Sequence, residues 1–213
     1  MDDPKPGAAA PATPPSGGDA TPVAPKKTDG GAAPKLDAAV PSRSLERLKE
    51  ILPDAVEEVS FHCGVPIVRV RPERILDVCR FLKDDPDCGM TFLADLCGVD
   101  MIRLRPGGPR FDAVYHLFSI EHRERLTVKA AVVEDGEVAS VTEVWRGANW
   151  HEREAFDMLG IRFAGHPDPR RILMPEDFDA HPLRKDFPLE GREKDHGYWR
   201  RPDDGQGRTY RES

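Results

Sequence analysis

The sequence is poor in the motifs by which proteins usually hold metals and cofactors. Its 213 residues include only four cysteines, and no two of them form a C-x-x-C pair. Zinc ribbons, dithiol redox sites and ferredoxin-type clusters all use closely spaced cysteines, so their local motifs are absent. The chain also has no G-x-G-x-x-G or P-loop motif. We therefore expect no metal, flavin or nucleotide site in this chain, and reduced thiols in a cytosolic setting.

Long apolar runs and uncompensated positive charge are absent as well. No stretch reaches the roughly 18 apolar residues of a membrane span. The start, MDDPKPG, lacks the basic and apolar segments of a secretory signal. The net charge is −7, and the basic residues have acidic neighbours instead of forming a stripe. Because phosphate binding requires an uncompensated cationic surface, the sequence argues against a nucleic-acid partner.

Composition divides the chain into three parts. Residues 1–41 are mostly Ala, Pro, Gly, Thr and Lys, which bury too little apolar surface to order a chain, so we predict a disordered extension. Residues 42–164 hold nearly all the aliphatic and aromatic clusters and are predicted to form the folded domain. Residues 165–213 are again rich in proline and charge but keep large apolar residues. We interpret them as an extended arm and tail lying along a protein surface.

The hydrophobic pattern of the middle part predicts helices and short strands. Helical spacing precedes Pro53 and Pro86, and β-branched and aromatic runs mark the strands. Because these strands follow one another without β–α alternation, we expect an α+β fold: a small, mainly antiparallel sheet with helices packed on it. The expected elements are a helix over 42–52, a hairpin over 56–70, a helix over 72–85, strands over 91–102, 111–120 and 126–133, and a helix from about 149.

The last predicted helix carries a carboxylate on its apolar face. Glu152 shares that face with Ala155 and Leu159. Asn149 followed by Glu152 fits a capping box, in which the glutamate folds back onto the backbone of the first turn. The alternative is an ion pair between Glu152 and an arginine of the arm. Gly160 fits the position just past the end of the helix.

Five prolines between residues 165 and 190 argue against a helix in the arm, and strand alternation is missing there too. A loop of this length is rare inside a compact domain. We therefore expect the arm to bind a partner and not to form part of the domain core. The expected apolar anchors are Ile172, Leu173, Met174 and Leu183, and the expected orienting charges are Arg170, Arg171, Arg184 and Lys185.

A known family matches this part of the sequence. The frame Glu152-Arg153-Glu154, then Asp157 and His166, followed by the run RRILMPEDFDAHPLRKDFP over 170–188, resembles the 30-kDa subunit of the respiratory NADH dehydrogenase complex. In bacteria this is the C subunit of NADH-quinone oxidoreductase (complex I). The match is dense over about 40 residues, whereas residues 42–144 carry no comparably sharp motif and residues 1–41 lie outside it.

The resemblance implies a fold, a role and a set of partners. It implies an α+β domain with an extended C-terminal arm, acting as a non-catalytic scaffold subunit of a proton-translocating enzyme complex. The implied partners are the 49-kDa-type subunit (the D subunit in bacteria) and the neighbouring cluster-bearing B and I subunits. NADH, FMN, iron–sulfur clusters and quinone would be bound by other subunits. The implied location is peripheral, on the cytoplasmic face of the bacterial inner membrane.

The same resemblance assigns partner-binding residues and no catalytic, cofactor-binding or metal-binding ones. The residues that match the family motif are Glu152, Arg153, Glu154, Asp157, Gly160, His166, Pro167, Arg170, Arg171, Leu173, Pro175, His181, Pro182, Leu183, Arg184 and Lys185.

Two other interpretations account for parts of the sequence. Related domains occur in membrane-bound nickel–iron hydrogenases and formate hydrogenlyase, so an equivalent subunit there remains an alternative that gene neighbours would decide. A metallohydrolase could use His151, His166 and His181 with nearby aspartates, but the spacing fits no H-E-x-x-H pattern.

Overall fold

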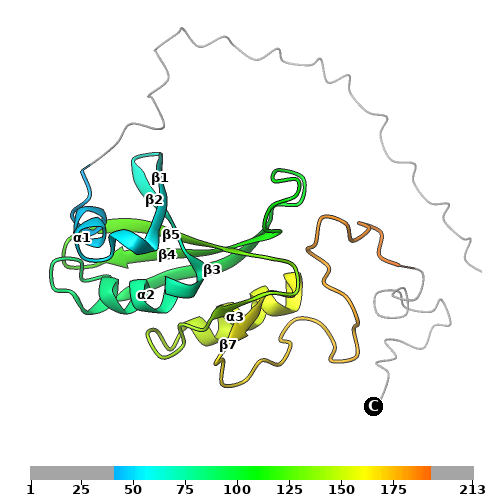
Figure 1. Ribbon diagram of the computed structural model, residues 1–213. Helices are drawn as coiled ribbons and strands as arrows, with labels where there is room; N and C mark the ends of the chain where they lie inside the picture. The colour runs from blue at the N-terminus through cyan, green and yellow to red at the C-terminus, as the bar shows by residue number, and fades with distance from the viewer. Residues whose placement is uncertain (1–40, 193–213) are drawn as a thin grey trace, which may run out of the picture. The chain divides into compact units, whose positions relative to one another are not determined.

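A computed structural model describes residues 41–192 of the chain. The predicted disordered extension, apart from residue 41, and the end of the tail lie outside the described residues. A five-stranded sheet and three α-helices make up most of the described part (Figure 1). The elements are α1 (Arg43–Ile51), η1 (Pro53–Ala55), β1 (Val56–His62), β2 (Val65–Val70), η2 (Pro72–Arg74), α2 (Ile75–Asp84), β3 (Phe92–Asp100), β4 (Phe111–Ser119), β5 (Glu124–Val132), β6 (Glu137–Ala139), α3 (Ala148–Leu159) and β7 (Arg162–Ala164).

The sheet has the strand order β1-β2-β5-β4-β3. Its pairs are antiparallel except for β2 with β5, which run parallel in a register that joins Ile67 to Thr127. The predicted α+β class with a mainly antiparallel sheet is therefore confirmed. Two short strands, β6 and β7, pair in parallel as a separate ribbon beside α3. Each is three residues long, which is too short for side-chain alternation to reveal.

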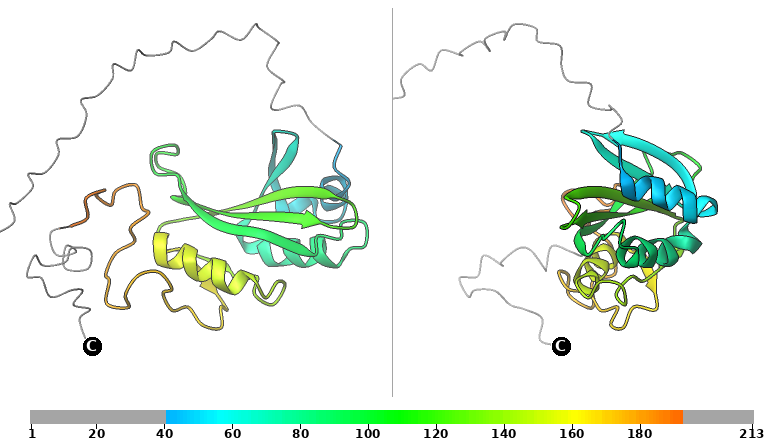
Figure 2. Two further views of the ribbon diagram at one scale, coloured as in Figure 1. Left: turned by 180° about the vertical axis from the view of Figure 1, so that it is seen from behind. Right: turned by 90° about the vertical axis from the view of Figure 1, so that its left-hand side faces the viewer.

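Side-chain alternation places the core on one face of the sheet. In β2, Pro66, Val68 and Val70 are buried and alternate with partly exposed residues. The helices α2 and α3 cover the buried face (Figure 2). Apolar residues at helical spacing drive this packing because each buried aliphatic side chain stabilises the fold by roughly 1.5–3 kcal/mol. The opposite face of the sheet carries no helix among the described residues.

The strand β3 lets α3 pack unusually close. A Cβ at Gly98 would lie 2.5 Å from Leu159 Cδ1 and 2.7 Å from Ile161 Cδ1. Glycine at this position therefore brings the end of α3 against the edge of the sheet. This contact fixes where the segment after Leu159 leaves the domain.

The start of α3 differs from the sequence prediction. The N-cap is Gly147, without a side-chain cap hydrogen bond, so the predicted capping box of Asn149 and Glu152 is wrong. Glu152 instead accepts a hydrogen bond of 2.7 Å from the Val141 backbone N–H, outside the helix. The alternative ion pair of Glu152 with an arm arginine is not observed within residues 41–192 either. The end of the helix is confirmed, because Gly160 follows it with a left-handed φ of 81°.

Within residues 41–192, no helix is both long and apolar enough to cross a membrane.

Candidate functional site

The arm folds back onto its own domain as a chain of turns, coloured yellow-orange to orange in Figure 1. Residues 165–192 contain no helix or strand. Backbone hydrogen bonds close its turns, from Phe178 to Pro175, from Phe187 to Arg184 and from Gly191 to Pro188, at 2.9–3.1 Å. Proline presets φ for such turns, which is why this sequence gives an ordered but irregular path.

The carboxylate of Asp157, on α3, holds the arm in place. Its Oδ2 accepts hydrogen bonds from three successive backbone N–H groups, those of Ile172, Leu173 and Met174, at 3.0, 2.7 and 2.9 Å. Its Oδ1 accepts a hydrogen bond from Arg171 Nη1 at 2.6 Å. Successive N–H groups that converge in this way form an anion-binding nest. The arm thus wraps a negative charge that the helix supplies.

The protonation of Asp157 follows from these contacts. Its side chain is fully buried, and burial alone would raise its pKa. The three N–H groups and the Arg171 guanidinium outweigh that effect and hold the pKa of Asp157 below its ordinary value. The carboxylate is therefore ionised at neutral pH, and its charge is compensated entirely by the arm.

Arg153, one turn before Asp157, binds the residues of the arm that come just before the segment held by Asp157. Its Nε and Nη2 donate to the carbonyl oxygens of Arg170 and Arg171 at 2.9 and 3.1 Å. Its guanidinium also lies 5.2 Å from the centre of the Trp150 ring, within cation–π range. Arg153 and Asp157 thus both bind the arm through charge-assisted hydrogen bonds.

Two histidines at the junction form hydrogen bonds with backbone groups. The N–H of Asp168 donates to His166 Nδ1 at 3.0 Å, so Nε2 carries the proton and donates to the Asn149 carbonyl at 3.1 Å. His181 Nδ1 donates to the Asp157 carbonyl at 2.9 Å, and burial lowers the pKa of His181. Both rings are therefore engaged with backbone groups and do not face each other as ligands.

Gly160 allows the arm to cross the end of α3. A Cβ there would lie 2.5 Å from Arg184 Nη2 and 2.7 Å from His181 Nε2. Arg184 Nε donates to the Leu159 carbonyl at 2.7 Å, which places a cation at the negative end of the helix. Its guanidinium also lies 5.3 Å from the centre of the buried Phe111 ring. Helix end, glycine and arm therefore form one packed unit.

A second charge cluster attaches the far part of the arm to the sheet. Arg110 is 7% exposed and contacts Asp100 at 3.1 Å, Glu134 at 2.6 Å and Asp186 at 2.6 Å. Asp100 also accepts the Lys185 backbone N–H at 2.9 Å. Although burial opposes it, these donors hold the pKa of Asp100 below its ordinary value. The arm is thus attached at two places, α3 and the β3–β4 end of the sheet.

The apolar residues of the arm divide into two groups, which the sequence did not foresee. Phe178 is 2% exposed and Met174 packs against the core, so these residues face the domain itself. Leu173 and Leu183 are 61% and 57% exposed, and Leu189 is fully exposed. The expectation that the whole arm stays outside the domain's buried part is therefore wrong for Phe178 and Met174.

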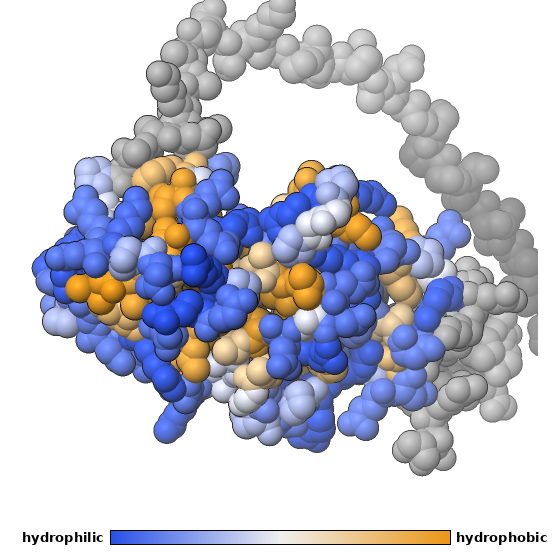
Figure 3. Space-filling model, viewed as in Figure 1, coloured by the Kyte–Doolittle hydropathy of each residue, from blue (hydrophilic) through white to orange (hydrophobic). Residues whose placement is uncertain are grey.

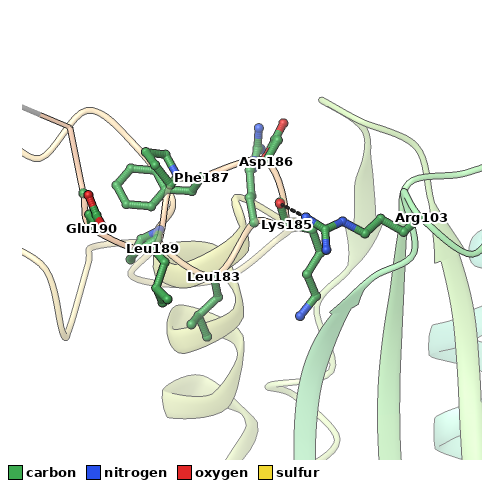
Figure 4. A pocket seen from close by; sticks show the side chains of 11 residues that line it. Arg103, Leu183, Lys185, Asp186, Phe187, Leu189 and Glu190 are labelled. Atoms are coloured by element: carbon green, nitrogen blue, oxygen red, sulfur yellow. Dashed lines mark hydrogen bonds between the residues drawn. The ribbon is translucent and has the colours of Figure 1, made fainter.

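A groove of about 870 Å³ is lined by residues 182–191 of the arm and by Arg103 of the β3–β4 loop. Arg103 reaches across it and donates to the Lys185 carbonyl at 3.1 Å, while Leu183, Phe187 and Leu189 lie along the arm side (Figure 4). Leu104, the next residue of the loop, is 76% exposed. On the face drawn in Figure 3, apolar patches are scattered among charged residues, including over this loop. Exposed leucines on a backbone that hydrogen bonds and ion pairs hold in place are typical of a docking surface.

The motif residues thus have distinct places. The exposed ones are Glu154, Pro167, Arg170, Leu173, Pro175, Leu183 and Lys185, and those tied to α3 or to the arm itself are Arg153, Asp157, Gly160, His166, Arg171, His181 and Arg184. Pro182 is half-buried, and Glu152 lies away from the arm beside Val141. Asp100, Arg103, Arg110 and Phe178 were missed, because nothing local in the sequence shows that the β3–β4 end meets the arm.

The charged groups of the junction are engaged in holding the arm, which suits binding more than chemistry. Among the carboxyl groups, Glu152 has the most raised pKa, which burial shifts to about 7. Its side chain is fully buried, so a substrate in solution has no access to it. Within the described residues the junction offers no open pair of acid and base. The charged groups of the junction thus hold the arm against α3.

Comparisons with known proteins show the family of the chain. The family model for the 30 Kd subunit of respiratory-chain NADH dehydrogenase matches residues 68–193. The NADH-quinone oxidoreductase C subunit 2 of Rhizobium etli (strain CIAT 652) is 52% identical over 151 residues, covering 71% of this chain and 79% of that protein. The C subunit of the same oxidoreductase from Roseiflexus sp. (strain RS-1) is 53% identical over 150 residues, covering 70% and 84%.

Solved structures point the same way. A trypsin-resistant fragment (1-134) of Nqo5 matches with a TM-score of 0.50 and 32% identity, covering 59% of this chain and 98% of the fragment. A chain of an archaeal membrane-bound sulfane sulfur reductase matches with a TM-score of 0.57 over 79% of this chain and 99% of that chain. Its 24% identity supports a shared fold alone. On the family match and the identity to these two oxidoreductase subunits, the chain belongs to the 30 Kd subunit family of respiratory-chain NADH dehydrogenase.

Proposed function

We propose that this chain is a non-catalytic scaffold subunit of a proton-translocating NADH-quinone oxidoreductase. In that complex electrons pass from NADH through FMN and iron–sulfur clusters to quinone, all bound by other subunits. The chain docks on the 49-kDa-type subunit, near the B and I subunits, in the peripheral arm at the cytoplasmic face of the membrane. The named relatives are C subunits of this oxidoreductase, which favours it over the hydrogenase alternative.

One observation carries the proposal: the arm is held rigidly while its leucines face outward. Asp157 accepts hydrogen bonds from the backbone N–H groups of Leu173 and its two neighbours, and Arg110 contacts the Asp186 carboxylate, three residues after Leu183. Ordering these residues in advance lowers the entropy lost on association. Each exposed leucine that a partner covers contributes roughly 1.5–3 kcal/mol of burial free energy. The buried charges of the motif orient the arm, and the leucines provide the contact.

The test separates docking from folding. A strain lacking the native gene expresses the Leu173→Asp/Leu183→Asp double variant, whose changes are at exposed positions and leave the fold intact. We expect the variant chain to accumulate normally while the assembled complex falls at least tenfold, measured by co-purification of the 49-kDa-type subunit after mild detergent extraction. A buried aspartate facing an apolar partner surface is the cause.

The matched control is Ile120→Asp, which changes an equally exposed side chain (64%) at the turn between β4 and β5. It should assemble as well as the wild type. Full assembly of the double variant, or equal loss in the Ile120→Asp control, would contradict the proposed docking surface. Normal assembly with defective turnover would point to a catalytic role instead.

A further inference from the structure

Three side chains of types that bind metal ions meet on strands β3 and β4, outside the arm. Asp95, Cys97 and His116 each offer one ligand atom, and these atoms all lie within 4.8 Å of one another. Asp95 and Cys97 are two residues apart on β3, and His116 stands opposite Asp95 in the antiparallel register with β4. Alternation along a strand and pairing across strands bring such residues to one face.

The neighbourhood orients two of the three groups. His116 Nδ1 lies 3.2 Å from the Thr127 hydroxyl on β5, which leaves Nε2 as the nitrogen for an ion. His151, on α3, approaches Asp95 Oδ1 at 3.3 Å. Partners of this kind fix the direction of a histidine or carboxylate ligand in protein metal sites. Cys97 and His116 also line an open groove of about 690 Å³, so the ligand atoms are accessible from solvent.

From this arrangement we propose that Asp95, Cys97 and His116 form a binding site for one Zn²⁺-type divalent ion. The set combines one oxygen, one sulfur and one nitrogen donor, which suits a borderline-soft ion and not Mg²⁺ or Ca²⁺. Three protein ligands leave the fourth tetrahedral position to a water molecule. The site goes beyond the proposed docking function and does not depend on it.

Charge and geometry both allow the ion. Tetrahedral zinc places ligand atoms about 3.4–3.8 Å apart, given zinc–ligand bonds of about 2.0–2.3 Å. Because the ligand atoms lie within 4.8 Å of one another, they need to approach by at most about 1.4 Å. Binding exchanges the Cys97 thiol proton for the ion, so one proton is released. The carboxylate and the thiolate then neutralise the two positive charges.

The charges around Cys97 have opposing effects on the pKa of its thiol. Burial, followed by Asp95 and Glu154, raises the pKa of Cys97, whereas Lys129 lowers it. The two carboxylates that disfavour a thiolate also attract a divalent cation.

This site escaped the sequence prediction of no metal because that prediction searched for closely spaced cysteines. Here the third ligand comes from the neighbouring strand. Register, not local spacing, unites the set, and register is visible only once β3 and β4 are paired.

The experiment uses the purified full-length chain, stripped with a chelator and kept under a phosphine reductant that does not bind metal. Co²⁺ serves as the probe and Zn²⁺ as the competitor. We expect a thiolate-to-cobalt charge-transfer band that saturates at one equivalent and disappears when Zn²⁺ is added. Cys97→Ser should abolish the band, and His116→Gln and Asp95→Asn should each weaken Co²⁺ binding at least tenfold.

The matched control is Cys63→Ser, which removes the exposed thiol of the β1–β2 turn and should leave the titration unchanged. Circular dichroism establishes that each metal-free variant is folded. No charge-transfer band at one equivalent would overturn the site. So would a band that survives Cys97→Ser, a band lost in Cys63→Ser, or unchanged affinity in both His116→Gln and Asp95→Asn.

Discussion

Two buried carboxylates of α3 lie in opposite electrostatic environments. Asp157 has its charge compensated by three backbone N–H groups and Arg171. Glu152 accepts one backbone N–H, and its Oε2 has no hydrogen-bond partner in the described part of the chain. The same helix thus carries one carboxylate that the fold stabilises as an anion and one that the fold disfavours as an anion. Their responses to substitution and pH should therefore differ in sign.

Asp157→Asn should destabilise the protein by about 3 kcal/mol, because it leaves Arg171 without its buried partner. The folded pKa of Asp157 is depressed. Its contribution is therefore complete above the ordinary aspartate pKa of about 3.9 and is lost as pH falls below that value. Urea unfolding at pH 7 and pH 3 measures both effects, and the gap between wild type and variant should narrow at pH 3. The exposed Asp54→Asn change is the control; an equal loss there would refute this role of Asp157.

Glu152→Gln should alter stability with the opposite pH dependence. Burial, opposed by the Val141 N–H, raises the pKa of Glu152 from 4.5 to about 7. Ionisation is thus easier in the unfolded chain, and wild-type stability should fall between pH 4.5 and 7 by up to roughly 3 kcal/mol. Glutamine does not ionise, so the stability of the variant should not show this fall between pH 4.5 and 7. Thermal unfolding from pH 5 to pH 8 tests it, and parallel profiles for wild type and variant would exclude a raised pKa.

At the scale of elements, the sequence predicted the helices, the hairpin and the three long strands within a few residues. It could not give the parallel pairing of β2 with β5, because a strand's side-chain pattern is the same for either direction of its neighbour. The Glu152 prediction failed for a related reason. The carboxylate's partner is Val141, in the loop before the helix, and three-residue spacing alone could not distinguish this tertiary contact from a capping box.

At the C-terminal end of α3, the arm packs closely against one glycine. Gly160→Ala incurs the backbone cost of a left-handed φ, about 1–2 kcal/mol, and also displaces Arg184 and His181, which are tied to helix carbonyls. Gly107→Ala is a matched control, because Gly107 has a φ of 76° with nothing within 4 Å of its added Cβ. We expect Gly160→Ala to lower the free energy of unfolding by at least about 1 kcal/mol more than Gly107→Ala does. Equal losses in urea unfolding would show that the arm does not pack on this position.

For the whole molecule, composition placed the domain in the middle of the chain and treated the arm as separable. Phe178 shows why: an isolated aromatic in a proline-rich segment has no periodicity, so its burial is not readable from the sequence. Tertiary contacts decided which apolar residues face inward. The partition of the arm into an inward and an outward set is therefore information that only the folded chain contains.

A chain starting at Pro41 should fold and assemble as the full chain does. It keeps Ser42, which caps α1 by accepting the Leu45 N–H at 3.1 Å, and Ser44, which donates to Glu124 at 2.8 Å. A chain starting at Leu45 loses these contacts and should be less stable by at least about 1 kcal/mol. Thermal unfolding and native-gel activity of the complex measure the two outcomes. Loss of the complex with the Pro41 start would show that residues 1–40 are required.

The parallel pairing of β2 with β5 also bears on when this protein becomes ready during synthesis. Ile67 finds its register partner Thr127 only after the intervening strands β3 and β4 have been translated. The β1–β2 hairpin can therefore pair with β5 only late in synthesis. Such pairing between segments far apart in the sequence slows folding. The arm emerges last, and its N–H groups complete the setting of Asp157. Outward-facing leucines become ordered only on a finished domain, so a partner that selects them also selects completed chains over nascent ones.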